Sequence, residues 1–255
     1  MSRSGYWQDL TTVELAQFDA ATTVAVLPVG AIEQHGPHLP LSTDAVICRG
    51  IAAAALEHGC AQATMLVLPA IDLGHSPEHT SFPGTVHVDA GTLLDVWMSV
   101  GRGVRSAGFD KLVILNAHGG QRPLLDIAAV NLRVQHALNV ARANYFHFGM
   151  PDGLFEKDEV HMGIHGGEVE TSLMLHLAPE LVRRERLEDF RYADERRARN
   201  ETLSYNRPAG LAWLSEDLNE HGVVGNAARA DAQRGRKYLE FLGERLAAVC
   251  DEMLL

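Results

Sequence analysis

The sequence predicts an α/β fold, a three-layer α/β/α arrangement with a mostly parallel central sheet. Apolar runs rich in β-branched residues alternate along the chain with segments of helical character. These runs are apolar throughout, which is typical of parallel strands that are covered on both faces. No internal repeat or linker interrupts the alternation, so we expect one domain over residues 1–255.

Four strands are expected, at residues 22–29, 64–69, 111–116 and 139–146. The clearest is 111–116, where four apolar residues lie between a lysine and an asparagine. The run at 22–29 ends in Pro28-Val29-Gly30, which indicates a turn at its carboxyl end.

Five helices are expected, at residues 45–58, 89–107, 123–138, 168–177 and 231–254. The first has Ser42, Thr43 or Asp44 as its N-cap and Gly59 at its end. Pro123 suits the first turn of the third helix. Residues 183–219 show little periodicity, and we expect irregular structure there, either near the mouth of a site or at a subunit contact.

Composition excludes several classes of protein. The net charge of −11 argues against binding to nucleic acid or to an anionic membrane surface, both of which need a basic face. No apolar run reaches the length of a membrane span, and residues 1–7 lack the apolar core of a signal peptide, so we expect a cytoplasmic protein. The three cysteines form no C-x-x-C pair, which argues against a disulfide framework and a thiolate zinc site.

The chemically most informative stretch is Glu33-Gln34-His35-Gly36-Pro37-His38-Leu39-Pro40, followed by Asp44. If this segment is extended, Glu33 and His35 leave the same face, because a strand repeats every two residues. Carboxylate and imidazole together suit Zn²⁺, Mn²⁺ or Fe²⁺. A polar loop that caps a helix and faces water is the alternative, and the spacing alone does not decide between the two.

Two further polar clusters favour the metal site. Asn116-Ala117-His118-Gly119-Gly120-Gln121 follows the clearest strand, and His161 to Ser172 precedes an apolar helix. Loops at the carboxyl ends of strands are where open α/β sheets bind ligands. Three separate clusters at such junctions are hard to explain by solvation.

These motifs resemble the creatininase family of metal-dependent amidohydrolases. The resemblance rests on Glu33 to Pro40 with Asp44, on Phe82-Pro83-Gly84-Thr85, on Asn116 to Gly120, and on His165-Gly166-Gly167-Glu168-Val169-Glu170-Thr171-Ser172. Gly222-Val223-Val224-Gly225 extends the match toward the last helix. The motifs follow the family's order over nearly the whole chain, which implies a single creatininase-like metallohydrolase domain.

The resemblance implies two divalent metal ions per chain, with Zn expected first and Mn or Fe as alternatives. It carries over four ligands by motif: Glu33, His35, Asp44 and His118, with Asp44 bridging the two ions. Creatininase has a glutamate two residues after the histidine of its second motif, where this chain has Gly120. We therefore expect Glu168 as the remaining ligand, since several branches of the family pair the Gly-Gly form with a glutamate there. Glu170 is the second candidate for this ligand. The preferred interpretation of Glu170 is that it binds no metal and that its negative charge complements the dipole at the start of the helix.

The resemblance also assigns His165 as the catalytic histidine, acting as general acid–base or steadying an oxyanion. A supporting hydrogen bond is the alternative. His38 is expected to orient a ligand or touch substrate, Asn116 to fix the His118 loop, and Gly119 and Gly120 to let the backbone approach substrate. Three further histidines flank Phe82 to Thr85 and are expected to be mainly solvent-exposed, although one could line the pocket: His75, His79 and His87.

The expected reaction is hydrolysis of a C–N bond in a small-molecule substrate, such as a cyclic amide, a formamide or a related amide. The alternatives are opening of a C–C bond in a cyclic ketone, peptide trimming by a metallopeptidase, or a non-catalytic metal-binding scaffold. Creatininase carries tryptophans on loops over its pocket, and Trp7, Trp97 and Trp213 lie outside the corresponding stretches, so creatinine is not the expected substrate. The family resemblance also implies a homo-oligomer, most plausibly a hexamer.

Overall fold

The computed structural model describes residues 4–205 and 209–255. Residues 1–3 and 206–208 lie outside the described residues. The second of these gaps falls within the segment 183–219, which was expected to be irregular. The largest sheet has five strands in the order β1-β3-β2-β4-β5, and every neighbouring pair is parallel. This confirms the mostly parallel sheet. The strands are β1 Gly5–Tyr6, β2 Thr23–Val29, β3 Thr64–Val67, β4 Lys111–Asn116 and β5 Asn139–Asn144.

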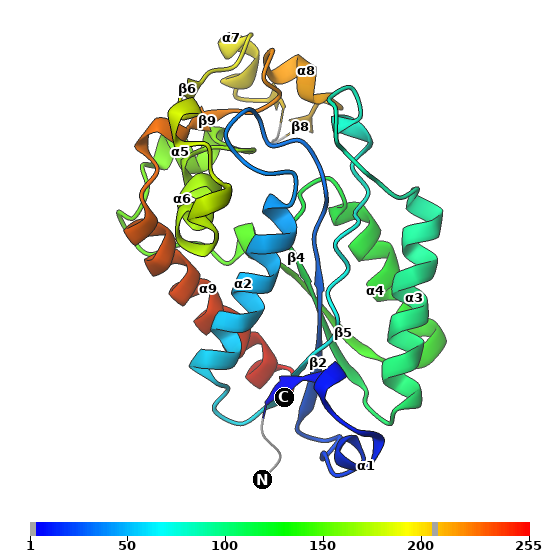
Figure 1. Ribbon diagram of the computed structural model, residues 1–255. Helices are drawn as coiled ribbons and strands as arrows, with labels where there is room; N and C mark the ends of the chain where they lie inside the picture. Colours follow the sequence, from blue (N-terminus) through cyan, green and yellow to red (C-terminus); the bar gives the residue numbers. More distant parts are fainter. Residues whose placement is uncertain (1–3, 206–208) are drawn as a thin grey trace.

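Helices cover the sheet on both faces, as expected for a three-layer fold (Figure 1). One layer holds α2 Thr43–His58, α6 Glu168–Leu177 and α9 Ala232–Glu252, and the other holds α3 Ala90–Ser106 and α4 Arg122–His136. Alternate residues of β2 enter different cores: Val24 and Val26 pack toward α2 and α9, whereas Ala25 and Leu27 pack toward α3 and α4. A strand with this two-sided burial is apolar throughout.

The expected helices and strands are present, with differences of a few residues at their ends. Asp44 lies inside the first turn of α2 and does not cap it, and Ser42 occupies the N-cap position without a side-chain hydrogen bond. The glycine at position 101 has a packing role within α3. A Cβ atom there would lie 2.4 Å from Cδ2 of Leu132 on α4, so glycine allows the two helices to pack closely.

The remaining elements are short. They comprise helices α1 Thr12–Leu15, α5 Lys157–Met162, α7 Glu195–Ala198 and α8 Ser215–Leu218, 3-10 turns Trp7–Asp9, Pro77–His79, Tyr145–His147, Pro179–Leu181, Arg184–Arg186 and Ala227–Arg229, and strands β6 Asp189–Phe190, β7 Leu203–Ser204, β8 Ala209–Gly210 and β9 Gly225–Asn226. Many of them belong to the segment predicted to be irregular, and Figure 1 shows α7 and α8 at the end of the molecule where α2 begins.

The connections reverse direction at β2 and β4. From β2 the chain passes through α2 to β3 on one side, and from β3 it passes through α3 to β4 on the other side of β2. The carboxyl ends of two neighbouring strands that lead in opposite directions form the position where open α/β sheets bind ligands. No helix among residues 4–205 and 209–255 is long and apolar enough to span a membrane.

Candidate metal centre and active site

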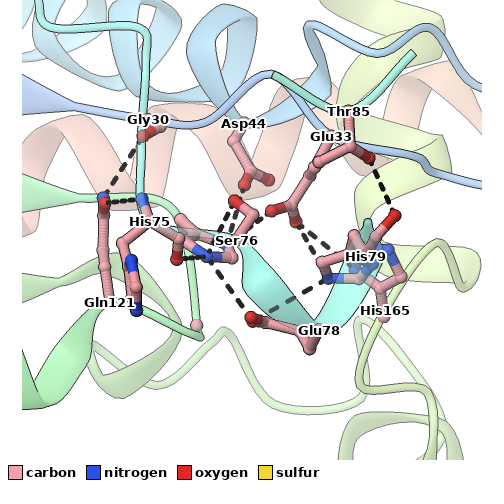
Figure 2. Close-up of polar contacts among 12 residues, drawn as sticks. Gly30, Glu33, Asp44, His75, Ser76, Glu78, His79, Thr85, Gln121 and His165 are labelled. Carbon is pink, nitrogen blue, oxygen red and sulfur yellow. Dashed lines mark hydrogen bonds and ion pairs between the residues drawn. The ribbon is translucent and has the colours of Figure 1, made fainter. Parts of the chain in front are cut away.

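Four of the side chains expected to bind metal converge at this end of the sheet. Glu33, His35, Asp44 and His118 are each at most 2% exposed. Nδ1 of His118 lies 3.1 Å from Oε2 of Glu33 and 3.3 Å from Oδ2 of Asp44. The other oxygen of Asp44, Oδ1, lies 3.2 Å from Nε2 of His35. Figure 2 shows the carboxylates of Glu33 and Asp44 directed toward a common centre.

Local hydrogen bonds explain how the first motif reaches this position. The segment after β2 is a closed loop rather than an extended strand, and the Glu33 amide donates to the carbonyl of Leu41 at 3.0 Å. The Gln34 amide donates to the hydroxyl of Thr85 at 3.1 Å, which ties the first motif to the Phe82-Pro83-Gly84-Thr85 segment. Gly36 has a φ of +72°, a backbone conformation that favours glycine.

Asn116 fixes the second motif in the way the sequence predicts. Its side-chain amide donates to the carbonyl of His118 at 2.7 Å, and its side-chain oxygen accepts from the His118 backbone amide at 3.0 Å. Gln121 supports this arrangement by donating to the same Asn116 oxygen at 2.8 Å. The imidazole of His118 therefore stands on a rigid turn at the end of β4.

Hydrogen bonds to carbonyls define which imidazole nitrogens face the cluster. Nε2 of His118 lies 2.9 Å from the carbonyl oxygen of His75 and must donate to it, so the Nδ1 lone pair faces Glu33 and Asp44. Nδ1 of His35 lies 3.2 Å from the carbonyl oxygen of Glu33, which leaves the Nε2 lone pair facing Asp44. In their neutral form, both rings would thus present lone pairs to carboxylates.

An imidazole nitrogen with a lone pair and a carboxylate oxygen repel each other unless a cation lies between them. Within the described residues, Nε2 of His35, Oε2 of Glu33 and Oδ2 of Asp44 have no hydrogen-bond partner. Burial disfavours the charged imidazolium, but the neighbouring carboxylates outweigh it: Asp44 raises the pKa of His35 to about 9, and Glu33 with Asp44 raises the pKa of His118. The cluster therefore requires protons or a metal cation to neutralise it.

The structure corrects the placement of the remaining carboxylate. Glu168 is buried but faces Arg234 of α9, with which it forms an ion pair, and it does not lie with the other expected ligands. Oε2 of Glu170 instead lies 4.0 Å from Nε2 of His35 and accepts from the Gly166 amide at 2.6 Å. Residues two apart on a helix point about 200° from one another, so only one of the two glutamates can face the cluster. Burial raises the pKa of Glu170 to about 7.

Gly120 has a different surrounding from the one expected. A Cβ atom at this position would lie 1.9 Å from Oε1 of Glu78 and 2.7 Å from Nε2 of His118. The Glu78 carboxylate thus lies where a side chain at position 120 would begin, and Oε1 of Glu78 lies 3.6 Å from Nε2 of His118. Gly120 makes room for Glu78, whereas Gly119 is exposed with no atom within 4 Å of a Cβ there.

His79 is a component of the site that the sequence did not identify. It is 2% exposed, and its Nε2 lies 3.4 Å from Oε1 of Glu33, so the expectation of an exposed histidine is wrong at this position. The available signal was its place three residues before Phe82-Pro83-Gly84-Thr85, but the side chains that contact it, Gln34 and Ser215, lie far from it in the sequence. His75 and His87 are partly buried.

His165 lies beside His79, with 4.4 Å between ring centroids. Its Nε2 is 2.9 Å from the carbonyl oxygen of Gln34 and donates to it, which leaves the Nδ1 lone pair facing Oε1 of Glu33 at 4.0 Å. Burial lowers the pKa of His165, and nearby histidines lower it further. Burial also lowers the pKa of His79, to about 2. Both rings are therefore neutral.

His38 lies at the edge of the site. Its Nε2 lies 2.9 Å from the Gly166 carbonyl and 3.1 Å from the Thr171 hydroxyl, and its ring stacks on Phe190. It therefore links the first and third motifs without reaching the cluster. The irregular segment also contributes here, because Trp213 packs edge-on against His79 and the Ser215 hydroxyl lies 2.9 Å from the Glu78 carbonyl oxygen.

Comparison with known proteins agrees with this geometry. The family model "Creatininase: Creatinine amidohydrolase" matches residues 8–250. The chain belongs to the creatininase family. Similar curated proteins include a mycofactocin precursor peptide peptidase of Mycobacterium ulcerans, which is 33% identical over 90% of this chain and 85% of the relative. A 3-dehydro-scyllo-inosose hydrolase of Thermotoga maritima is 28% identical over 98% and 83%, and a creatinine amidohydrolase of Pseudomonas putida is 31% identical over 74% and 78%.

Solved structures of the creatininase family superpose over the whole fold. A creatininase mutant complexed with creatine covers 99% of both chains at 26% identity with a TM-score of 0.80. A structure named "Creatininase Mn" covers 98% of both chains at 25% identity with a TM-score of 0.75. The fold class and the family expected from the sequence are confirmed. So is the enzyme class: this creatininase-family chain is a metal-dependent hydrolase that acts on amide-type C–N bonds.

Proposed function

We propose that the chain hydrolyses an amide C–N bond with two divalent metal ions held by Glu33, His35, Asp44, His118 and Glu170. The observation that supports this most strongly is the set of buried lone pairs that face one another without a hydrogen donor between them. Zn is the proposed metal, with Mn or Fe as alternatives, because mixed carboxylate and imidazole ligands suit these ions. Solved relatives named as a Zn–Zn type and as a Mn form agree with that choice.

The distances between the side chains support a proposed place for each ligand. Asp44 would bridge, since its two oxygens face different histidines. Glu33 and His118 would complete one position, and His35 and Glu170 the other. Ligand atoms of Glu33, His35 and Asp44 all lie within 4.8 Å of one another, so the two positions would lie next to each other at Asp44. When bound, such ions polarise a carbonyl group and lower the pKa of water toward neutrality.

His165 would carry the proton. Its Nδ1 faces the cluster as a lone pair, so it can accept a proton from the attacking water and return it to the leaving nitrogen. We expect His165→Ala to lower turnover by roughly 10²–10⁴-fold while the metal content stays the same. A role in orienting a metal ligand would instead weaken metal binding by about 10–100-fold.

For the substrate we propose a linear amide, such as a peptide bond, rather than creatinine. The support is the similarity to mycofactocin precursor peptide peptidases over nine-tenths of the chain, with 33% and 31% identity to two of them. The creatinine amidohydrolase matches over a smaller share, 74% of the chain.

A metal analysis combined with a substrate screen tests the proposal. Protein purified without chelator should contain two equivalents of Zn, Mn or Fe, and removal of the metal should abolish hydrolysis that metal addition restores. The screen should include short peptides, formamides, creatinine and a cyclic ketone. A metal-free protein with full hydrolytic activity would overturn the mechanism, and turnover of creatinine in preference to every peptide would overturn the substrate assignment.

Three further expectations stay predictions: a single domain over residues 1–255, a closed homo-oligomer such as a hexamer, and a cytoplasmic location. Light scattering at micromolar concentration tests the assembly, since a stable monomer would contradict it. Limited proteolysis tests the domain organisation, because a single domain should resist cleavage between its first and last strands.

A further inference from the structure

Gln34 contacts two histidines of the site at once, and the motif analysis gave it no role. It is 4% exposed. Its side-chain nitrogen Nε2 lies 2.9 Å from Nδ1 of His79 and 3.2 Å from Nε2 of His165. Its backbone carbonyl oxygen lies 2.9 Å from the same nitrogen of His165. We propose that Gln34 is a positioning residue that fixes opposite orientations of the N–H group on His79 and His165, an inference that rests on the proposed hydrolase site.

The orientation of the Gln34 amide is defined by its other contacts. Nε2 donates to the carbonyl of Gly222 at 2.7 Å, and Oε1 accepts from the backbone amide of Gly36 at 3.0 Å. Rotating the amide by 180° would place two acceptors at Gly222 and two donors at Gly36. The nitrogen therefore faces the histidines, and it can only donate.

The side-chain donor of Gln34 sets the tautomer of His79, and the backbone carbonyl oxygen of Gln34 sets that of His165. His165 donates from Nε2 to the Gln34 carbonyl oxygen, so that nitrogen cannot accept from the Gln34 side chain. The second N–H of Gln34 is therefore available to Nδ1 of His79, which must accept. His79 consequently carries its proton on Nε2, the nitrogen that lies 3.4 Å from Oε1 of Glu33.

The Ser215 hydroxyl also contacts His79, at 2.5 Å from Nδ1, and does not oppose this assignment. A hydroxyl has one hydrogen and rotates: it can direct that hydrogen to Nδ1 of His79, or to the Glu78 carbonyl oxygen 2.9 Å away while accepting from Nδ1, so it is compatible with either form of the ring. An amide nitrogen has no such freedom. Gln34 thus determines the tautomer, and Ser215 follows it.

The result is a hydrogen donor and a hydrogen acceptor side by side on one wall of the site. His79 presents an N–H group to the Glu33 carboxylate, while His165 presents a lone pair toward the same oxygen atom, 4.0 Å away. The donor holds a proposed metal ligand in place, as outer hydrogen bonds to ligating carboxylates do. The acceptor remains free to take a proton.

Neutron diffraction from deuterated crystals tests the proposal without reference to activity. We expect nuclear density for deuterium on Nε2 of both His79 and His165, and none on Nδ1 of His79. Deuterium on Nδ1 of His79 in the wild type would overturn the inference, even if the protein proves to be an active hydrolase. Conversely, the predicted deuterium positions in an inactive protein would support the role of Gln34 and contradict the proposed function.

Gln34→Glu provides the matching variant, because glutamate has the same shape but accepts where glutamine donates. We expect deuterium to move to Nδ1 of His79 and kcat to fall about 10–100-fold, the range for loss of an outer hydrogen bond, with KM changing less than threefold. Gln17→Glu makes the same chemical change at an exposed position and is the control. If Gln34→Glu keeps the wild-type deuterium positions and a kcat within twofold, Gln34 does not position these rings.

Discussion

The Oδ1 atom of Asp44 lies 3.2 Å from Nε2 of His35, a nitrogen that presents a lone pair when the ring is neutral and donates through Nδ1. Two acceptors at this distance in a buried place are stable only with a cation between them. The other Asp44 oxygen faces His118 in the same way at 3.3 Å. Asp44 is therefore the residue through which both proposed metal positions are connected.

Asp44→Ala should remove more metal than any other single ligand change, because it takes one oxygen from each position. We expect less than half an equivalent of metal per chain after dialysis, against about one equivalent for Glu170→Ala. Inductively coupled plasma mass spectrometry of the variants, purified together, measures this. Retention of both metals by Asp44→Ala would show that this carboxylate does not bridge.

Glu168→Gln and Glu170→Gln should have opposite consequences. Glu170 lies near His35, so its loss should lower metal affinity, by about tenfold or more. Glu168 is buried and paired with Arg234, so its loss should lower the free energy of unfolding and leave metal content unchanged. Metal titration and urea unfolding of both variants separate the two. If Glu168→Gln loses metal and Glu170→Gln does not, then Glu168 is the metal ligand, as expected from the sequence.

Asp251, which is not part of the metal site, should make the free energy of unfolding depend on pH. Its carboxylate accepts from the backbone amides of Ala61, Gln62 and Ala63 at 2.7–2.8 Å. Partial burial opposes ionisation, but these hydrogen bonds outweigh it and lower the pKa of Asp251 below its ordinary value of 3.8. A lowered pKa means that the contribution is fully present above about pH 4 and is lost as the pH falls through the folded-state pKa.

Asp251→Asn should therefore be less stable than the wild type at pH 7, by about 1 kcal/mol, as for the loss of a comparable cap. This difference should shrink steadily below pH 4. Urea unfolding of both proteins between pH 3 and pH 7 measures it, and because any metal loss affects both proteins, the difference isolates Asp251. A difference that is constant with pH would contradict the assignment.

Two glycines in helices should respond oppositely to alanine. A Cβ atom at Gly235 of α9 would lie 1.9 Å from the backbone oxygen of Ser172 on α6, so Gly235→Ala should lower stability by at least about 2 kcal/mol. Gly103 is exposed in α3 with no atom within 4 Å of a Cβ there, so Gly103→Ala should raise stability by roughly 0.5–1 kcal/mol. Thermal unfolding compares them, and an equal effect of both substitutions would mean that the α6–α9 packing is not as close as described.

The central sheet could be predicted because its strands are buried on both faces. β2 and β4 are apolar along most of their length, which marks them in the sequence without knowledge of their partners. β1 was not predicted, since Gly5–Tyr6 becomes a strand only through pairing with Leu66 and Val67 of β3. Such a short edge strand has no pattern of its own.

The site was predictable where a motif fixes the local backbone, and not where distant contacts decide. Asn116 and His118 interact within one turn, so their relationship follows from adjacency. The choice between Glu168 and Glu170 depends on which face of α6 meets α9, and the sequence does not specify that contact. His79 is buried by segments that lie far from it in sequence, through Gln34 and Ser215.

Anomalous diffraction at the Zn edge, from crystals grown with Zn, tests the central claim most directly. We expect two peaks per chain on either side of the Asp44 carboxylate, one near Glu33 and His118 and the other near His35 and Glu170. Peaks beside Glu168 and Arg234, or no peak within bonding distance of Asp44, would contradict it.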